Sequence, residues 1–280
     1  MGDYSAAAEQ YRKAIQHTEE LRAGLDPVQR AEFYNVRIKG FYRTAPYEGL
    51  ARVLIRLNEP LDAFRQSEYT KARMFAEGIS MRAAGSVPEV PKDVLETDSR
   101  LNDELAALTK NLQKASEKQD KEAIASLEPQ VTQARERLAA HVNMLRKQHP
   151  LFAATKYPQP MDLSQTDLKD NEWVIAYHVT DPGVIVYLTR GKNLVKAQFK
   201  PIPRKEIDDL VRLFRASFDM VGGKISAEAL AKFDFSAGNR LADILLADVL
   251  SDLPKDAAVI IIPDGSLGVV PFEMLVLNAG

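Results

Sequence analysis

The sequence predicts a mainly helical N-terminal region followed by a smaller α/β region. Over roughly the first 150 residues, apolar side chains recur at steps of three and four, which is the spacing of amphipathic helices. After residue 166 the pattern changes to short apolar runs bounded by Gly, Pro, Asp and Asn, which is typical of strands and turns. The proline-bearing stretch 150–165 lies between the two patterns, and we expect it to be a hinge.

The composition is ordinary for a soluble globular protein. The chain has 280 residues, of which 45% are hydrophobic and 27% are charged, and its formal net charge is −2. This balance gives no general attraction to nucleic acids or anionic membranes. The N-terminus lacks the apolar core of a signal peptide, and no apolar run reaches the roughly 20 residues of a membrane span. We therefore expect a cytoplasmic protein that does not contact membranes.

The chain contains no cysteine and only four histidines, which are widely spaced. This excludes a disulfide, a cysteine-ligated zinc ion and a thiol nucleophile on this chain. Because no two histidines have the spacing of a metal-binding helix, we expect neither a metal ion nor a cofactor. We expect His141 to lie on a helix surface or in a helix seam, and His178 to be a partnered residue of a sheet.

Two segments of the N-terminal region share a pattern of small and aromatic residues. In the first, Ala7, Tyr11 and Ala14 lie on one helical stripe, where small residues allow a neighbouring helix to approach closely. The second runs from Tyr47 to Ala63 and combines an aromatic, a Leu, a small and a large residue with a break before its final Ala. Both segments resemble the tetratricopeptide repeat, which predicts TPR-like helical repeats over residues 1–82.

The spacing of these segments departs from that repeat. They lie further apart than its period of about 34 residues, so we expect an additional or extended helix over Pro27–Thr44, which Pro46 kinks or ends. The first segment matches the second helix of a repeat, so we also expect its first helix to precede Met1. Repeats of this kind form a concave surface for a peptide or protein partner.

A local excess of basic residues accompanies the helices. Its members are Arg30, Arg37, Lys39, Arg43, Arg52 and Arg56. A solvated helix face is one interpretation, and a groove for an acidic partner or RNA is the other. No aromatic-rich single-strand motif accompanies these charges, so nucleic acid is the weaker alternative.

An antiparallel helical hairpin is predicted over residues 99–149, after a linker over 83–98. Leucines recur at steps of four and three before a polar turn over 116–122, and a second apolar stripe follows the turn. We expect Asp98 or Ser99 to cap the first arm, and Pro129 to bend the second arm or break it after Leu127. Each arm is thin, so the hairpin either packs on neighbouring domains or forms a homodimer with a second copy.

Three short strands and two helices are predicted after the hinge. Trp173–Val179, Val184–Thr189 and Leu194–Phe199 are separated by tight turns, which indicates an antiparallel meander. Amphipathic helices are expected over Pro203–Met220 and Asn239–Ser251.

The run Val259–Ile262 is predicted to be a further strand. Its three consecutive isoleucines indicate burial on both faces, as in a parallel sheet between helices. In such sheets functional residues gather in the loops at the carboxyl ends of the strands, and Pro263-Asp264-Gly265 is such a loop. Without neighbouring strands this segment would expose an edge, so we expect marginal stability or aggregation.

The residues around this strand carry the most specific motif. A helix ends near Leu253-Pro254, and an apolar strand leads to Pro263-Asp264-Gly265-x-Leu267 and Pro271-Phe272-Glu273-x-Leu275. This order closely resembles the opening of the CHAT domain, a caspase- and separase-like domain found mostly in bacteria and often behind tetratricopeptide repeats. The helix Ala63–Phe75 and the meander from Trp173 are similar to the family's as well. The resemblance predicts that residues 166–280 form the N-terminal part of a CHAT α/β domain.

CHAT proteins are predicted to be cysteine endopeptidases, in which a His activates a Cys thiolate and backbone N–H groups hold the oxyanion. In the family both residues follow the Pro-Asp-Gly motif. This chain has no Cys, and all its His residues precede the motif. The resemblance therefore implies a chain that is inactive by itself, and we expect the peptidase core to continue after Gly280.

The motif residues themselves are expected to be structural or to line the cleft. They are Pro263, Asp264, Gly265, Leu267, Pro271, Phe272 and Glu273. Gly265 permits a positive φ, Asp264 can accept hydrogen bonds from backbone amides, and Phe272 can pack into the sheet. Two hypotheses for function stay open: the N-terminal part of a repeat-regulated peptidase, or a non-catalytic interaction platform with a degenerate CHAT region.

Overall fold

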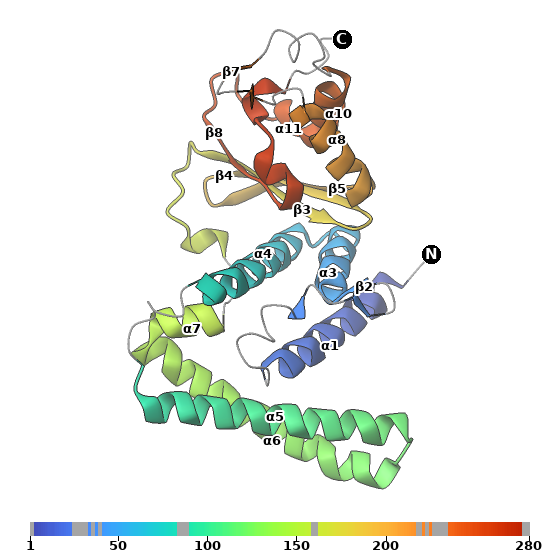
Figure 1. Cartoon of the computed structure of the whole chain (residues 1–280), viewed down its shortest axis with the longest axis vertical. Coiled ribbons are helices and arrows are strands. Elements are labelled where there is room, and N and C mark those ends of the chain that lie inside the picture. The colour runs from blue at the N-terminus through green and yellow to red at the C-terminus, as the bar shows by residue number, and fades with distance from the viewer. Residues whose placement is uncertain are drawn as a thin grey trace. The chain divides into compact units, whose positions relative to one another are not determined.

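The computed structural model describes residues 3–23, 33–34, 37–38, 41–82, 90–157, 162–216, 220–221, 224–225 and 235–275. The chain forms two compact units. The first comprises Met1–Val53 and Arg65–Met161, and the second comprises Leu54–Phe64 and Asp162–Gly280. The described residues are mostly helical, and a small mixed sheet lies in the C-terminal part of the chain (Figure 1).

The N-terminal helices pack through the stripe that the sequence predicts. α1 (Tyr4–Ala23) lies against α3 (Ala45–Arg56), where a Cβ added to Gly49 would lie 2.5 Å from the ring of Tyr11. α4 (Pro60–Arg82) follows α3 after the turn at Asn58. The predicted stripe residues of α3 and α4 are buried: Tyr47, Leu50, Ala51, Leu54 and Ala63.

The helix expected over Pro27–Thr44 does not extend over the described end of that range, where Phe33 is helical but residues 37–38 and 41–42 form two short strands. β1 (Arg37–Ile38) pairs antiparallel with β2 (Phe41–Tyr42). Pro46 neither kinks nor ends a helix, because it occupies the first turn of α3, where its missing N–H costs nothing. The rings before the two strands, Phe33 and Tyr34, join Tyr47 in an aromatic cluster, so their apolar surface serves a tertiary contact.

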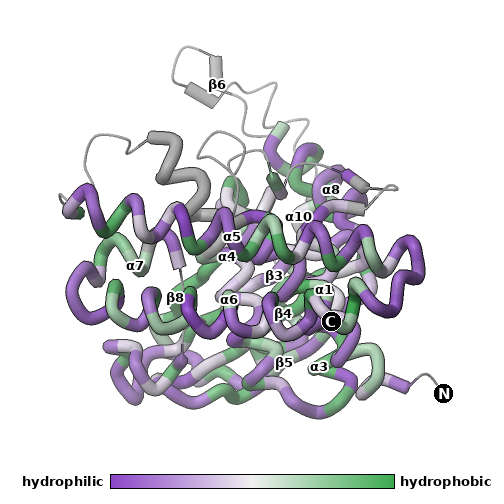
Figure 2. Tube along the Cα trace, turned by 90° about the horizontal axis from the view of Figure 1, so that it is seen from below, coloured by the Kyte–Doolittle hydropathy of each residue, from purple (hydrophilic) through white to green (hydrophobic). Residues whose placement is uncertain are grey.

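The predicted antiparallel hairpin consists of α5 (Lys92–Glu117) and α6 (Lys121–Gln148). Its turn holds Gln119 at a positive φ of 55°, and the Asp120 side chain caps α6 by accepting from the Ala123 nitrogen at 3.0 Å. Leucines on both arms form the seam between them, and Figure 2 shows hydrophobic positions recurring along α5 and α6 among hydrophilic ones.

The ends and course of the hairpin differ from prediction in two places. α5 begins at Lys92, inside the stretch predicted to be a linker, so Asp98 lies within the helix and caps nothing. Its carboxylate is buried and is satisfied by residues of α7 (Pro150–Lys156) and by Tyr157. Pro129 does not break the second arm, because α6 is continuous through it.

One buried acid connects α1 to the hairpin. Glu20 is 6% exposed and accepts two hydrogen bonds from the guanidinium of Arg135 on α6, the one from Nη2 at 3.0 Å. Thr109 on α5 donates a third, at 3.2 Å. The adjacent Glu19 accepts from the hydroxyls of Tyr34 and Tyr47, at 2.9 and 2.7 Å. Neighbouring carboxylates of α1 therefore bind two different parts of the unit.

The predicted hinge 150–165 contains regular structure. α7 occupies its first half, and a short 3-10 helix, Leu163–Gln165, lies near its end. The side chain of Asp162 caps that turn by accepting from the Ser164 nitrogen at 2.9 Å. The segment is thus a structured connector in its described part.

The predicted meander is confirmed. β3 (Trp173–Thr180), β4 (Gly183–Arg190) and β5 (Asn193–Lys200) pair antiparallel in sequence order. β8 (Val259–Ile262) adds to β3 in parallel, which gives the strand order β5-β4-β3-β8. The sheet is therefore mixed, with its parallel pair at one edge (Figure 1).

Helices cover one face of this sheet. α8 (Arg204–Ala216), α10 (Phe235–Leu245) and α11 (Ala247–Leu250) enclose the face that carries Ile175 and Tyr177. The first predicted helix is shorter than expected, since Met220 lies in a two-residue strand. The second begins earlier, at Phe235, and is interrupted at Leu246.

The opposite face of the sheet is also buried. It carries Val174, His178 and Tyr187, and His178 is 3% exposed. The ring of Phe64, at the start of α4, meets that of Tyr187 edge-to-face with centroids 5.2 Å apart. The first turn of α4 thus contacts the sheet, and it belongs to the same compact unit.

Candidate functional site

β8 is an edge strand of the sheet. Among the described strands it has one neighbour, β3, with Val174 opposite Ile260 and Ala176 opposite Ile262. Ile261 packs on the helical core, whereas Ile260 and Ile262 remain 44% and 39% exposed. The prediction of burial on both faces is therefore wrong for the part of the chain that the structure describes. A run of isoleucines predicts an apolar strand, but it does not predict how many other strands pair with it.

The Pro263-Asp264-Gly265 turn extends the contact between β8 and β3 beyond the last paired residues. Asp264 Oδ2 accepts a hydrogen bond from the backbone nitrogen of Val179 at 2.7 Å. Gly265 has a φ of 56°, a left-handed conformation that only glycine adopts without strain. The turn then enters a 3-10 helix, Gly265–Val269, whose Leu267 is fully buried. The backbone roles expected of Asp264 and Gly265 are confirmed.

Arg204 lies over the same turn. Its Nη2 donates to the carbonyl of Val179, and its Nε donates to Asp181 Oδ1 at 3.2 Å. A Cβ added to Gly265 would lie 3.5 Å from Nη1 of the same guanidinium. Asp264 and Arg204 therefore bind the N–H and the carbonyl of one strand residue. The sequence reasoning missed Arg204, because nothing in its local pattern distinguishes it from a solvated helix N-terminus.

Phe272 packs into the sheet as expected. Its ring stacks on Tyr177, with centroids 5.7 Å apart and planes 21° from parallel. The Tyr177 hydroxyl donates to the carbonyl of Leu245 at 3.1 Å, and burial raises the pKa of this phenol. Phe272 thus fixes the second half of the motif to the same core as Leu267.

Two residues of the motif point outward. Pro263 and Glu273 are exposed, whereas Pro271 is half-buried. Ser266, which the sequence reasoning did not single out, has a buried Oγ with no hydrogen-bond partner among the described residues. The seven motif residues therefore lie along the turn after β8 and two 3-10 helices, Gly265–Val269 and Phe272–Met274, and most of them serve the fold.

Four of the six basic residues of the N-terminal region lie in the described part, and two of these stack on aromatic rings. Arg37 lies over the ring of Tyr42, 4.2 Å from its centroid, and donates to its hydroxyl. Arg43 lies over Phe33 in the same way, at 4.1 Å. Arg52 is half-buried and Arg56 is exposed. Arg30 and Lys39 lie outside the described residues.

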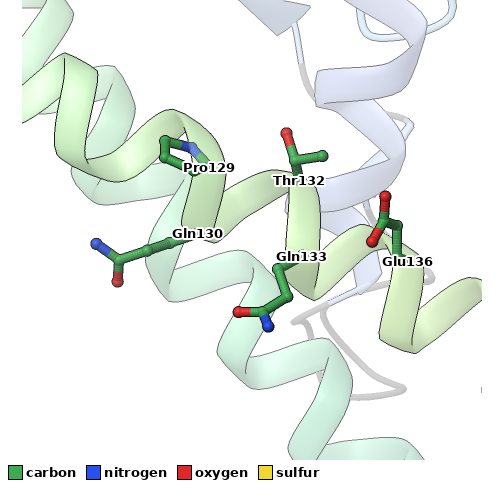
Figure 3. Close-up of a pocket in the computed structure, with 5 residues that line it drawn as sticks. All are labelled: Pro129, Gln130, Thr132, Gln133 and Glu136. Atoms are coloured by element: carbon green, nitrogen blue, oxygen red, sulfur yellow. The ribbon is translucent and has the colours of Figure 1, made fainter.

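A polar hollow lies along α6, with a volume of about 580 Å³. Its lining residues are Pro129, Gln130, Thr132, Gln133 and Glu136. Figure 3 shows these side chains leaving a single helix in different directions. Gln130 donates to the Ser126 carbonyl at 2.9 Å and Thr132 to that of Glu128 at 3.0 Å. Because these groups bond their own helix, the hollow offers no convergent set of polar atoms.

The described ranges contain neither a candidate metal site nor a candidate membrane span. No three His, Asp or Glu side chains among the described residues come together in a way that could hold a metal ion. Nor does any helix in the part of the chain that the structure describes combine the length and the apolar character that crossing a membrane requires.

Comparison of this chain with protein-family models, curated proteins and solved structures gives no match. The fold and the contacts of the motif residues are therefore the observations on which a function can be argued.

Proposed function

We propose that this chain is the N-terminal part of a CHAT-type, caspase-like cysteine endopeptidase. Its helices would bind a protein or peptide partner and regulate the α/β region, and the catalytic His and Cys would not be on this chain. The observation that carries the proposal is the position of the Pro263–Glu273 motif. It follows a strand parallel to its neighbour, at the carboxyl ends of both, where active-site loops of α/β sheets gather.

The open edge of β8 is consistent with this proposal. A peptidase core of this type needs further strands to carry its nucleophile and base, and β8 offers an unpaired edge among the described strands. Its exposed Ile260 and Ile262 would be covered by the elements that accompany those strands. Since this chain has no cysteine, the nucleophile of such a protein would lie elsewhere.

The helical region supports a binding role more than a catalytic one. The half-buried Glu19 and the buried Glu20 are engaged with tyrosines, threonine and arginine, so they are unsuited to acid–base chemistry. We propose a cytoplasmic location and a protein partner. A second copy bound through the hairpin is a weaker proposal, since Leu95 is the large hydrophobic residue that the described parts of α5 and α6 leave exposed.

The alternative is a non-catalytic interaction platform. The favouring observation is that Asp264, Gly265, Leu267 and Phe272 all have structural contacts, so the motif needs no chemistry to explain it. In that case the edge of β8 would bind a partner strand and no peptidase would be assembled.

The coding sequence downstream of residue 280 distinguishes the two. The peptidase proposal expects a His and then a Cys, each directly after an apolar strand. A longer chain carrying both should be labelled by an electrophilic peptide such as a fluoromethyl ketone, and a Cys→Ala variant should not. A downstream sequence without these residues, or a longer chain that the probe does not label, would reject the peptidase in favour of the platform.

A further inference from the structure

A buried cluster joins α7 to the helical hairpin. Asp98 on α5 has a side chain that is 1% exposed. Its Oδ2 accepts from Lys156 Nζ, and its Oδ1 accepts from the Tyr157 hydroxyl at 2.8 Å. Asn102, one turn along α5, donates to that same hydroxyl at 2.7 Å. Both residues at the end of α7 are therefore held by one carboxylate.

His141 approaches this carboxylate from α6. Its Nε2 lies 3.4 Å from Asp98 Oδ1 but makes no hydrogen bond within the described residues. Asn102 Oδ1 is likewise buried without a hydrogen-bond partner there. The cluster is thus polar and incompletely satisfied, which is unusual for a site whose only role is stability.

Apolar burial in α7 is small. The helix has seven residues, and an isolated helix of that length is unstable in water. Ala153 is buried and Phe152 is half-buried, whereas Leu151 is 65% exposed. Burial of a methyl group and part of a ring contributes less free energy than ordering seven residues costs. The bonds to Asp98 therefore contribute to the docked state of α7.

We propose that the Asp98 cluster is a conformational latch that holds α7 on the hairpin and can be released without unfolding the hairpin. Release of α7 has a structural consequence because α7 is the last helix before the segment that leads to β3. Residues 150–157 would no longer be fixed to the hairpin, and the tether between the hairpin and β3 would gain a reach of up to about 28 Å. The latch would operate whether or not the chain belongs to a peptidase.

Release should affect α7 and not the hairpin, because the α7 partner of Asp98 is closer to water than the seam residues are. Lys156 is 17% exposed and sits at the end of its helix, so its ammonium can turn to water when the carboxylate is removed. The seam of the hairpin is formed by separate residues, among them Leu105, Val131 and Ala134. Loss of the Asp98 charge should therefore free α7 and leave the seam closed.

Hydrogen exchange of the whole chain tests the latch in Asp98→Asn. Amides that bond within α7, including those of Ala153 and Tyr157, should exchange at least tenfold faster than in the unsubstituted chain. Amides of α5 and α6 around the seam should keep their rates. Glu104→Gln is the matched control, because it removes an acid of the same helix that pairs with Arg137 of α6 at 2.6 Å. Glu104→Gln should change the exchange rates of neither the α7 amides nor the seam amides.

A second variant covers the case in which Asp98→Asn fails to fold. Lys156→Met leaves the carboxylate with Tyr157 and removes the ion pair, and it should accelerate the α7 amides in the same way. Equal exchange of α7 in the unsubstituted chain and in both variants would overturn the latch. Loss of protection throughout the hairpin in either variant would overturn it too, because Asp98 would then be an ordinary core residue.

Discussion

The carboxylate of Asp264 accepts a hydrogen bond from the backbone nitrogen of Val179 at 2.7 Å, although the two residues lie 85 positions apart in sequence. This bond continues the pairing of β8 with β3 past Ile262, where the ladder between the two backbones ends. Arg204 binds the carbonyl of the same valine. A side chain from the motif and a side chain from α8 thus bind the two backbone polar groups of Val179, near the end of β3.

Replacing Asp264 with Ala should destabilise the α/β unit. The variant leaves the Val179 N–H without its acceptor, at a cost of about 1–3 kcal/mol in the free energy of unfolding. Urea denaturation followed by far-UV circular dichroism measures the change. Asp256→Ala removes an exposed acid that precedes β8 and should change the free energy by less than about 0.5 kcal/mol. Equal effects of the two variants would contradict a structural role for Asp264.

Gly265 and Gly268 should respond differently to Ala, though both lie in the same 3-10 helix. Gly265→Ala places a Cβ at a φ of 56° and should cost about 1–2 kcal/mol. Gly268→Ala meets no atom within 4 Å and has no positive φ, so it should be neutral or slightly stabilising. Thermal unfolding of both variants gives the comparison. A Gly268 variant as unstable as the Gly265 variant would show that conformation is not the cause.

The stability of the chain should fall as pH rises above 10. Burial raises the pKa of Tyr177 above its ordinary value of 10.0, so the folded state holds a proton that the unfolded state releases. The stabilisation is complete below pH 10 and is lost above it, by about 1.4 kcal/mol per pH unit for each such proton. Burial also raises the pKa of Tyr47, and proximity to Glu19 adds to the shift.

Tyr177→Phe isolates one of these protons. In urea titrations between pH 9 and 11, the variant should lose less stability with pH than the unsubstituted chain does. At pH 7 it should be less stable by about 1 kcal/mol, because the Leu245 carbonyl loses a donor. Parallel pH profiles for the two chains would mean that the phenol is accessible to water.

Gly49 should tolerate a side chain less well while Tyr11 is present. A Cβ at this position would lie 2.5 Å from the ring, so Gly49→Ala should displace the Tyr11 side chain and cost about 1 kcal/mol. Tyr11→Leu in the same background should recover part of this loss, because a smaller side chain leaves room for the methyl group. Thermal unfolding of the two single variants and the double variant measures the recovery. Additive losses in the double variant would show that the two residues do not compete for space.

The exposed isoleucines of β8 should drive self-association. Ile260 and Ile262 lie on one face of an edge strand without charges, which is a typical site of strand-to-strand pairing. Ile262→Lys should reduce association at high concentration, as measured by analytical ultracentrifugation, with little change in stability. Val195→Lys on β5 alters a side chain of similar exposure, 47%, at the opposite edge. An equal reduction by both variants would assign the effect to net charge.

Local sequence predicted the elements whose residues interact with near neighbours in the chain. The bounds of β3, β4 and β5 follow from alternating apolar residues and tight turns, and the seam of α5 and α6 follows from leucines at helical spacing. The positive φ of Gly265 was predictable as well, because an Asp-Gly pair after a strand favours a turn in which the glycine has a positive φ. These features depend on backbone sterics and on side-chain period, and short windows of sequence determine both.

Tertiary structure decided the features that depend on partners far along the chain. Asp98 has the sequence context of a helix cap, yet it is buried inside α5 because Lys156 and Tyr157 reach it. The run of isoleucines in β8 determines that this segment is an apolar strand, and the number of strands beside it determines how much of that strand is exposed. The periodicity of apolar residues indicates whether a side chain favours a buried position. The fold determines which neighbouring residues bury it.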